Sequence, residues 1–181
     1  MSHFYRFTPP FVSQGEEAHC WAAALQSWLS CVTWTFGQKS GEWEGIGDLS
    51  GTQWSRRPRT KAQLLTDYSD QTDEGGSLTA GSMAPYRAIG LDVGMDVDFI
   101  DPSSLSLAYV TGKLKNFGHL YMTYFSVHMR HAVVVYGTST TDGIGVMDPN
   151  PNVKFTHRKV DFFKTPERLR EWITVGWPVK S

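Results

Sequence analysis

Hydrophobic residues follow helical spacing through much of the first two thirds of the chain and strand-like spacing in the last third. The residues that follow Cys20 are nearly all apolar, and a helix that is apolar on every side is usually buried. We therefore expect a core helix over Ala18–Phe36 that ends at Gly37. Further helices are expected where apolar residues recur at helical spacing, over Arg59–Tyr68, Leu78–Ile89 and Asp101–Phe117. The glycine-rich residues 37–58 predict a loop.

The other segments have the pattern of β-structure. Residues His131–Tyr136 contain an unbroken apolar run, as buried strands do, and Thr140–Gly143 has the composition of a hairpin turn. Further strands are expected over Leu91–Ile100, Leu120–Val127, Gly145–Met147 and Val153–Thr156, and a last helix is expected over Thr165–Trp172. Helices followed by an antiparallel sheet indicate an α+β fold. We expect one domain over residues 1–181, mainly helical in 1–118 and mainly β in 119–181.

Charge and hydropathy give no reason to expect nucleic acid or a membrane as a partner. The formal net charge of −1 gives no electrostatic reason to expect nucleic acid or an anionic membrane surface as a partner. No apolar run reaches the roughly 18 residues that a membrane span requires. The first residues lack the basic and then apolar form of a signal peptide, so we expect export, if it occurs, to depend on a dedicated secretion system.

The two cysteines, Cys20 and Cys31, are expected to be free thiols. On one helix they would lie roughly 16 Å apart at about 1.5 Å rise per residue, whereas a disulfide needs Cα atoms within about 7 Å. Cys31 is expected to be a buried structural residue. Two cysteines and the spacing of the six histidines do not suggest a metal site, so neither a metal nor a cofactor is expected. The acidic turn at residues 69–76 reads as solvated surface rather than as a calcium site.

Cys20 is the candidate nucleophile. At the start of a helix the backbone N–H groups are unpaired and the helix dipole favours negative charge, which favours the thiolate. His131 begins the Val-rich strand and Asp148 ends the returning strand, so a hairpin would bring them together as a base and its orienting group. Gln14, six residues before Cys20, could donate its amide to an oxyanion.

Two of these assignments have competitors. Cys20 by itself could be a small buried hydrophobic residue, which is the usual role of a free cysteine. His19 and His128 are weaker candidates for the base, since neighbouring helical residues such as His19 and Cys20 point away from one another. Trp21 is expected either to shield the cysteine and histidine from water or to be part of the core.

These residues together resemble the papain-like cysteine peptidases. The resemblance rests on Gln14, the run Cys20-Trp21-Ala22-Ala23, the run His131-Ala132-Val133-Val134-Val135-Tyr136-Gly137 and the run Val146-Met147-Asp148-Pro149. Papain has Asn where this chain has Asp148. In this respect the chain is more similar to compact bacterial members of the family, namely AvrRpt2-like effector proteases and peptidase domains that process double-glycine leaders. His19 before the cysteine and Arg130 before the histidine depart from many relatives.

The resemblance implies a helical part and an antiparallel sheet with the active site between them. It implies Cys20 as nucleophile, His131 as base and acid, Asp148 as orienting group and Gln14 as oxyanion donor. The expected activity is cleavage of a specific protein substrate by a bacterial effector or toxin domain, acting in the cytoplasm of a target cell. A Gly-Gly cleavage site and a cognate immunity protein are further expectations. A peptidoglycan amidase or endopeptidase and a catalytically silent binding module are the alternatives.

Overall fold

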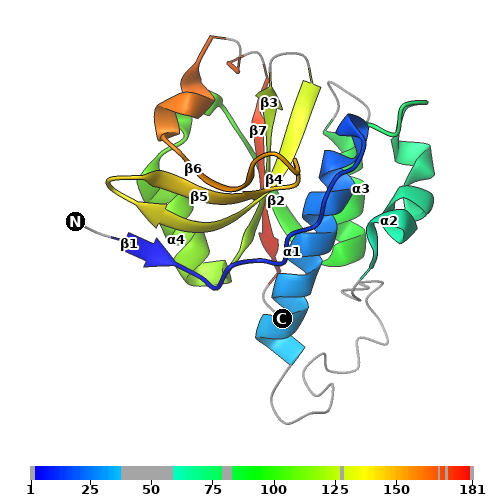
Figure 1. The fold of residues 1–181 in the computed structure, drawn as a ribbon, viewed down its shortest axis with the longest axis horizontal. Coiled ribbons are helices and arrows are strands. Elements are labelled where there is room, and N and C mark those ends of the chain that lie inside the picture. The colour runs from blue at the N-terminus through cyan, green and yellow to red at the C-terminus, as the bar shows by residue number, and fades with distance from the viewer. Residues whose placement is uncertain are drawn as a thin grey trace.

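The computed structural model describes residues 3–37, 59–78, 83–126, 129–166, 168–169 and 171–179. Within these residues a seven-stranded antiparallel sheet forms the centre of the molecule (Figure 1). Its strands follow the order β2-β7-β3-β4-β5-β6, and β1 pairs with β4. The strands are β1 His3–Tyr5, β2 Met95–Ile100, β3 Leu120–Ser126, β4 Met129–Ser139, β5 Gly143–Asp148, β6 Lys154–Arg158 and β7 Ile173–Pro178. The predicted α+β class is confirmed.

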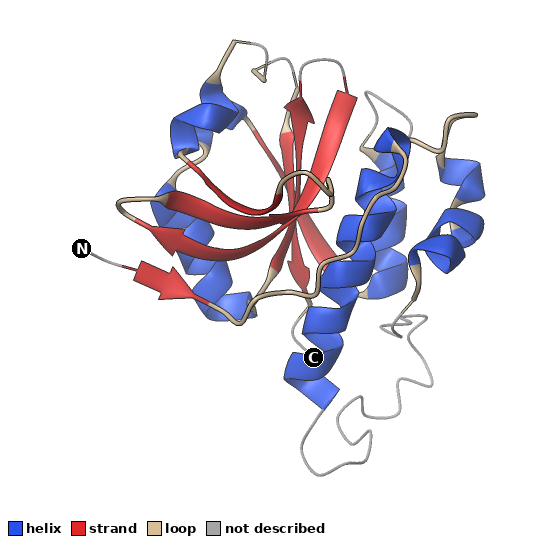
Figure 2. Ribbon diagram, in the orientation of Figure 1, coloured by secondary structure: helices blue, strands red, loops and turns tan. Residues whose placement is uncertain are grey.

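Helices cover both faces of the sheet (Figure 2). Three of them, α1, α2 and α3, lie on one side, and α4 lies on the other together with a short 3-10 helix over Val160–Lys164. The α-helices are α1 Cys20–Gly37, α2 Lys61–Asp67, α3 Ala84–Val93 and α4 Leu107–Phe117. None of the helices in the described part of the chain is long and apolar enough to cross a membrane.

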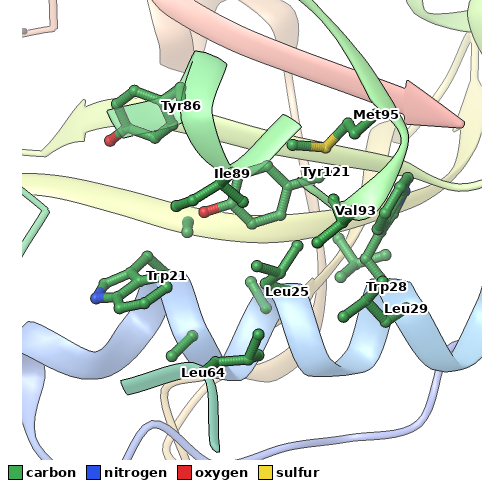
Figure 3. Close-up of a cluster of buried hydrophobic side chains, with 14 of the residues drawn as sticks. Trp21, Leu25, Trp28, Leu29, Leu64, Tyr86, Ile89, Val93, Met95 and Tyr121 are labelled. Carbon is green, nitrogen blue, oxygen red and sulfur yellow. The ribbon is translucent and has the colours of Figure 1, made fainter. Parts of the chain in front are cut away.

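The apolar run of β4 serves two cores at once, because successive side chains of a strand point to opposite faces. Ala132 and Val134 belong to the core under α1–α3, whereas Val133 and Val135 belong to the core under α4. Figure 3 shows the first of these cores, with side chains of α1 facing those of α3. Burial on both faces explains why β4 reads as a continuous apolar segment rather than as an alternating one.

Helix α1 matches its prediction closely. A 3-10 turn over Glu17–His19 leads into it, and Trp28 in its middle is fully buried. The Trp28 indole N–H donates a hydrogen bond of 2.9 Å to the carbonyl of His119. Cys20 and Cys31 are both free thiols, and the fully buried Cys31 is part of the core as expected. Residues 38–58 of the predicted loop lie outside the described residues.

Helix α3 differs from its predicted position at Leu78–Ile89. It begins at Ala84, with Pro85 in the first turn, runs through Gly90 and ends at Gly94 in the left-handed conformation. Gly90 does not stop the helix. A Cβ there would lie 2.7 Å from the carbonyl oxygen of Met95, so this glycine allows the helix to pack closely against the chain that follows it.

Two other predicted helices were wrong in extent or in kind. The segment expected as one helix over Asp101–Phe117 is a short 3-10 helix followed by α4, because Asp101 and Ser106 each cap a separate helix. Among the described residues of 165–172 there is no helix. Strand β7, which follows them, was not predicted; it lies between β2 and β3 and all six of its residues are buried.

Strands β2 to β6 lie where the sequence predicts them, with bounds that differ by a few residues, whereas β1 was not predicted. The β4–β5 hairpin turns at Thr140–Asp142, and Gly143 adopts a φ of 99° there. Two strands from the first 118 residues, β1 and β2, join the sheet. The sheet therefore draws on both the mainly helical and the mainly β part of the chain.

Candidate active site

Cys20 is the first residue of α1, and its side chain is 4% exposed. Its Sγ lies 3.7 Å from the backbone oxygen of Arg130, to which the thiol donates. The α1 N-terminus is thus packed against β4 immediately before His131. This packing brings a thiol at the positive end of a helix dipole next to the candidate base.

His131 and Asp148 lie on the neighbouring antiparallel strands β4 and β5. The His131 Nε2 is 2.8 Å from Asp148 Oδ1, and the same oxygen accepts the N–H of Asn150 at 2.9 Å. The Tyr124 ring meets the imidazole edge to face, with ring centres 5.6 Å apart. Because Nε2 faces Asp148, Nδ1 is the nitrogen that remains for the hydrogen bond with the Cys20 side chain.

The surroundings of His131 favour its charged form. Burial alone lowers the pKa of this histidine, but the hydrogen bonds and charges of Asp148 and Cys20 outweigh burial and raise the pKa to about 9. His131 is therefore protonated at neutral pH. A positive charge beside Sγ favours the thiolate.

Gln14 is buried, with 6% of its surface exposed, and its backbone is held from two sides. The N–H of Gln14 donates to the carbonyl of Pro149 at 2.9 Å, and its own carbonyl accepts from Lys61 Nζ at 2.7 Å. One bond ties Gln14 to the residue after Asp148, and the other ties it to α2. Its side-chain Oε1 is buried and has no hydrogen-bond partner among the described residues.

The structure thus brings Cys20, His131 and Asp148 together and ties Gln14 to the turn beside them. Their catalytic roles remain a prediction that a functional test must decide. The competing base His19 lies elsewhere: its Nε2 is 3.9 Å from Glu16 and packs against Gly76. His128 lies outside the described residues.

The acidic turn is closed by the side chain of Asp73. Asp73 Oδ1 accepts the N–H groups of Gly75 and Ser77, each at 2.9 Å. Within the described residues, no group of three or more His, Cys, Asp and Glu side chains gathers in a way that could hold a metal ion. Gly76 supplies the carbonyl that accepts the Trp21 indole N–H at 2.9 Å, so this turn also fixes Trp21 beside Cys20.

A pocket of about 190 Å³ opens next to the thiol. Cys20, Trp21 and His131 form one side of it, and residues from α3, β3, β4, the acidic turn and the segments before α1 and β7 form the rest. Sequence reasoning noted Arg130 only as a departure from a motif and missed the part that Glu171 and Lys61 play around the site. No local signal marks these residues, because their partners lie far away in the chain.

No protein-family model matches the sequence, and no curated protein matches it significantly. Solved structures do match. The fold is similar to the peptidase domain of Streptococcus ComA, a bi-functional ABC transporter involved in a quorum-sensing pathway. The TM-score is 0.56 at 18% sequence identity, and the match covers 94% of this chain and 99% of that domain.

The fold is papain-like. The peptidase domain of Streptococcus mutans ComA also matches, with a TM-score of 0.39 at 18% identity, over 65% of this chain and 89% of that one. In this papain-like fold the thiol lies at the start of α1, where that helix meets the sheet.

Proposed function

We propose that this protein is a cysteine endopeptidase that hydrolyses peptide bonds of a protein substrate. One observation carries the proposal: His131 Nε2 is hydrogen-bonded to Asp148 Oδ1 at 2.8 Å, and the Cys20 thiol at the start of α1 donates to the backbone oxygen of Arg130, the residue immediately before His131. Nucleophilic catalysis needs a nucleophile, a base and an orienting group in this order. The similarity of the fold to a domain described as a peptidase supports the same reading.

The proposed reaction starts from a thiolate–imidazolium pair, in which the Cys20 proton already resides on His131 because the raised pKa of His131 keeps it there at neutral pH. The thiolate attacks the peptide carbonyl carbon, and the carbonyl oxygen becomes an oxyanion held by the Cys20 N–H and the Gln14 amide. His131 then gives its proton to the leaving amine as the C–N bond breaks. Neutral His131 next takes a proton from water, which hydrolyses the thioester and releases the acid.

The biological setting is a second part of the proposal. Two free thiols suit a protein that acts in a reducing compartment. We propose that the domain is a bacterial effector or toxin, secreted by a dedicated system and active in the cytoplasm of its target cell. Its producer would then need an immunity protein. The ComA likeness also makes cleavage at a Gly-Gly site a candidate specificity.

The experiment must distinguish the peptidase from two alternative functions. A peptidoglycan amidase would use the same acyl transfer on a cell-wall crosslink. A silent binding module would need neither the hydrogen bond between His131 and Asp148 nor a thiol packed beside them, so the presence of both counts against it.

The deciding experiment compares new protein N-termini in bacterial lysates treated with wild type, Cys20→Ala or Cys31→Ala. Cys31→Ala is the matched control, because it removes the other thiol from the same helix. New termini that appear with wild type and Cys31→Ala but not with Cys20→Ala would support a peptidase. Release of crosslink peptides from isolated sacculi instead would favour the amidase, and no Cys20-dependent product from either source would refute hydrolysis.

A further inference from the structure

Two arginines, Arg158 and Arg168, lie against the same aromatic ring on the side of the sheet that α4 covers. The guanidinium carbon of Arg158 is 4.7 Å from the centre of the Phe162 ring, and that of Arg168 is 3.9 Å from it. Arg158 is the last residue of β6, and Phe162 belongs to the 3-10 helix over Val160–Lys164. Because both guanidinium groups contact one ring, their positive charges lie within about 9 Å of each other.

Neither of these arginines has a carboxylate partner among the residues that the structure describes. Other arginines of the protein do have one. Arg59 is paired with Asp92 at 2.8 Å, and Arg130 is paired with Glu171 at 2.7 Å. The Nε atom of each arginine beside the Phe162 ring is also buried, and it has no hydrogen-bond partner within the described residues.

The two guanidinium groups keep donors that a ligand can reach. Both side chains are half-buried, and Arg168 uses only Nη1, which donates to the Thr165 hydroxyl at 2.8 Å. Two like charges at this separation repel each other, and a buried N–H group without a partner costs free energy. An anion that bound both arginines would reduce both costs.

Tyr124 connects the two arginines to the proposed catalytic site. Its ring centre is 5.8 Å from that of Phe162 and 5.6 Å from that of His131, and it meets both rings edge to face. Burial, and then the charge of Asp148, raise the pKa of the Tyr124 hydroxyl, whereas the two arginines lower it, so this hydroxyl lies near all three charges. Because an extended chain advances about 3.3 Å per residue, a substrate covers the distance from His131 to the arginines in roughly three or four residues.

We propose that Arg158 and Arg168 form an anion site that binds an acidic side chain of the protein substrate, at one fixed position a few residues from the scissile bond. The inference rests on the proposed peptidase function. The planar guanidinium group matches the geometry of a carboxylate, which has two oxygens and accepts several hydrogen bonds. One carboxylate can therefore accept from both arginines at this separation.

The sequence around the two arginines is basic, which favours an acidic partner. Residues 154–168 contain five Lys and Arg residues and two Asp and Glu residues, in a chain whose formal net charge is −1. A basic side chain of the substrate would be repelled here. An apolar side chain would remove water from the guanidinium N–H groups without replacing its hydrogen bonds, which costs free energy. A carboxylate satisfies both the charge and the donors.

The first experiment treats a library of peptides from a denatured proteome with wild type and with Cys20→Ala, and sequences the new termini. Glutamate and aspartate should be enriched at one position relative to the cleaved bond, and a variant that carries both Arg158→Gln and Arg168→Gln should lose the enrichment. Cleavage without acidic enrichment at any position would overturn the inference and leave the peptidase proposal intact. Absence of Cys20-dependent cleavage would count against the proposed function and would overturn the inference with it.

The second experiment uses two peptides that differ only by glutamate or glutamine at the enriched position, and measures the ratio of their kcat/KM values. A hydrogen bond between charged groups predicts a ratio on the order of tenfold for wild type at low salt, and the ratio should fall as added salt screens the charges. Arg158→Gln and Arg168→Gln should each lower the ratio. Arg168→Lys should keep part of it, because the positive charge remains but the paired donors do not.

Arg87→Gln is the matched control. The Arg87 guanidinium carbon also lies against an aromatic ring, 5.5 Å from the centre of Phe99, but Arg87 belongs to α3 on the other side of the sheet. This variant should leave the ratio unchanged, and an equal fall in Arg87→Gln and Arg168→Gln would overturn the assignment. A ratio close to one in wild type would overturn it as well, and that result does not depend on whether any variant folds.

Discussion

Replacing Asp148 with alanine tests the central hydrogen bond of the proposed site. Asp148 is 4% exposed, and its Oδ1 is the partner of His131 Nε2 at 2.8 Å. The change removes both the acceptor and the negative charge, and leaves His131 with burial, which lowers its pKa, and with Cys20, which raises it. We therefore expect the pKa of His131 to fall well below its wild-type value.

The size of the effect follows from the pKa itself. The rise from 6.5 to about 9 corresponds to about 3 kcal/mol of net preference for the imidazolium, at about 1.4 kcal/mol per pH unit. Asp148 and Cys20 share that preference. Because the folded-state pKa lies above the unfolded value, this stabilisation is complete below about pH 6.5 and is lost as the pH rises through about 9.

The assay compares alkylation of Cys20 by iodoacetate, an anion, and by iodoacetamide, which is neutral. A protonated His131 attracts the anion, so the ratio of the two rates reports the charge beside Sγ. In wild type the ratio should stay high up to about pH 9 and then fall. In Asp148→Ala the fall should occur at a lower pH, and Asp148→Asn should lie between them because the amide oxygen still accepts a hydrogen bond.

Cys31 provides an internal control in the same samples. It is fully buried, and burial raises the pKa of its thiol to about 12, so it should remain unmodified in the folded protein. A fall of the ratio at the same pH in wild type and Asp148→Ala would refute the reasoning. A fall of the wild-type rate ratio near pH 6.5 would refute it as well.

Three other predictions test the surroundings of the site and the fold. Lys61→Met should lower kcat about fivefold with little change in KM, because Gln14 loses a backbone hydrogen bond worth about 1 kcal/mol, and Lys61→Arg should restore part of the rate. Burial lowers the pKa of His119, so the free energy of unfolding should fall as the pH drops below about 6.5. Urea unfolding at pH 8 and pH 5 should show a smaller loss of this free energy in His119→Gln than in wild type. An equal loss in the two proteins would contradict the assignment. Gly143→Ala should cost more than about 1 kcal/mol of unfolding free energy, since φ is 99° and the new Cβ would lie 2.3 Å from a backbone oxygen. Gly112→Ala in α4 is its control, because nothing lies within 4 Å of the new Cβ, and equal melting temperatures for the two variants would argue against the strain at Gly143.

The sequence by itself located the thiol and its two partners. Helix α1 could be read because its apolar residues and its terminal Gly37 are local signals, and they place Cys20 at the start of the helix. The hairpin could be read because a turn sequence separates two apolar segments. Antiparallel pairing then brings His131 and Asp148 together whatever surrounds them.

Only the tertiary structure decided the identity of β7 and the shape of the pocket. The local pattern of residues 165–172 favours a helix and does not indicate the strand that follows. Strand β7 is stabilised by hydrogen bonds to β2 and β3, which lie far away in sequence. The ion pair between Arg130 and Glu171 joins residues that are 41 positions apart in the sequence. The contact between Lys61 and Gln14 joins residues that are 47 positions apart. Periodicity reports how a segment turns its apolar side toward a core. It carries no information about which distant segment supplies the neighbour, and the charge of the pocket depends on that neighbour.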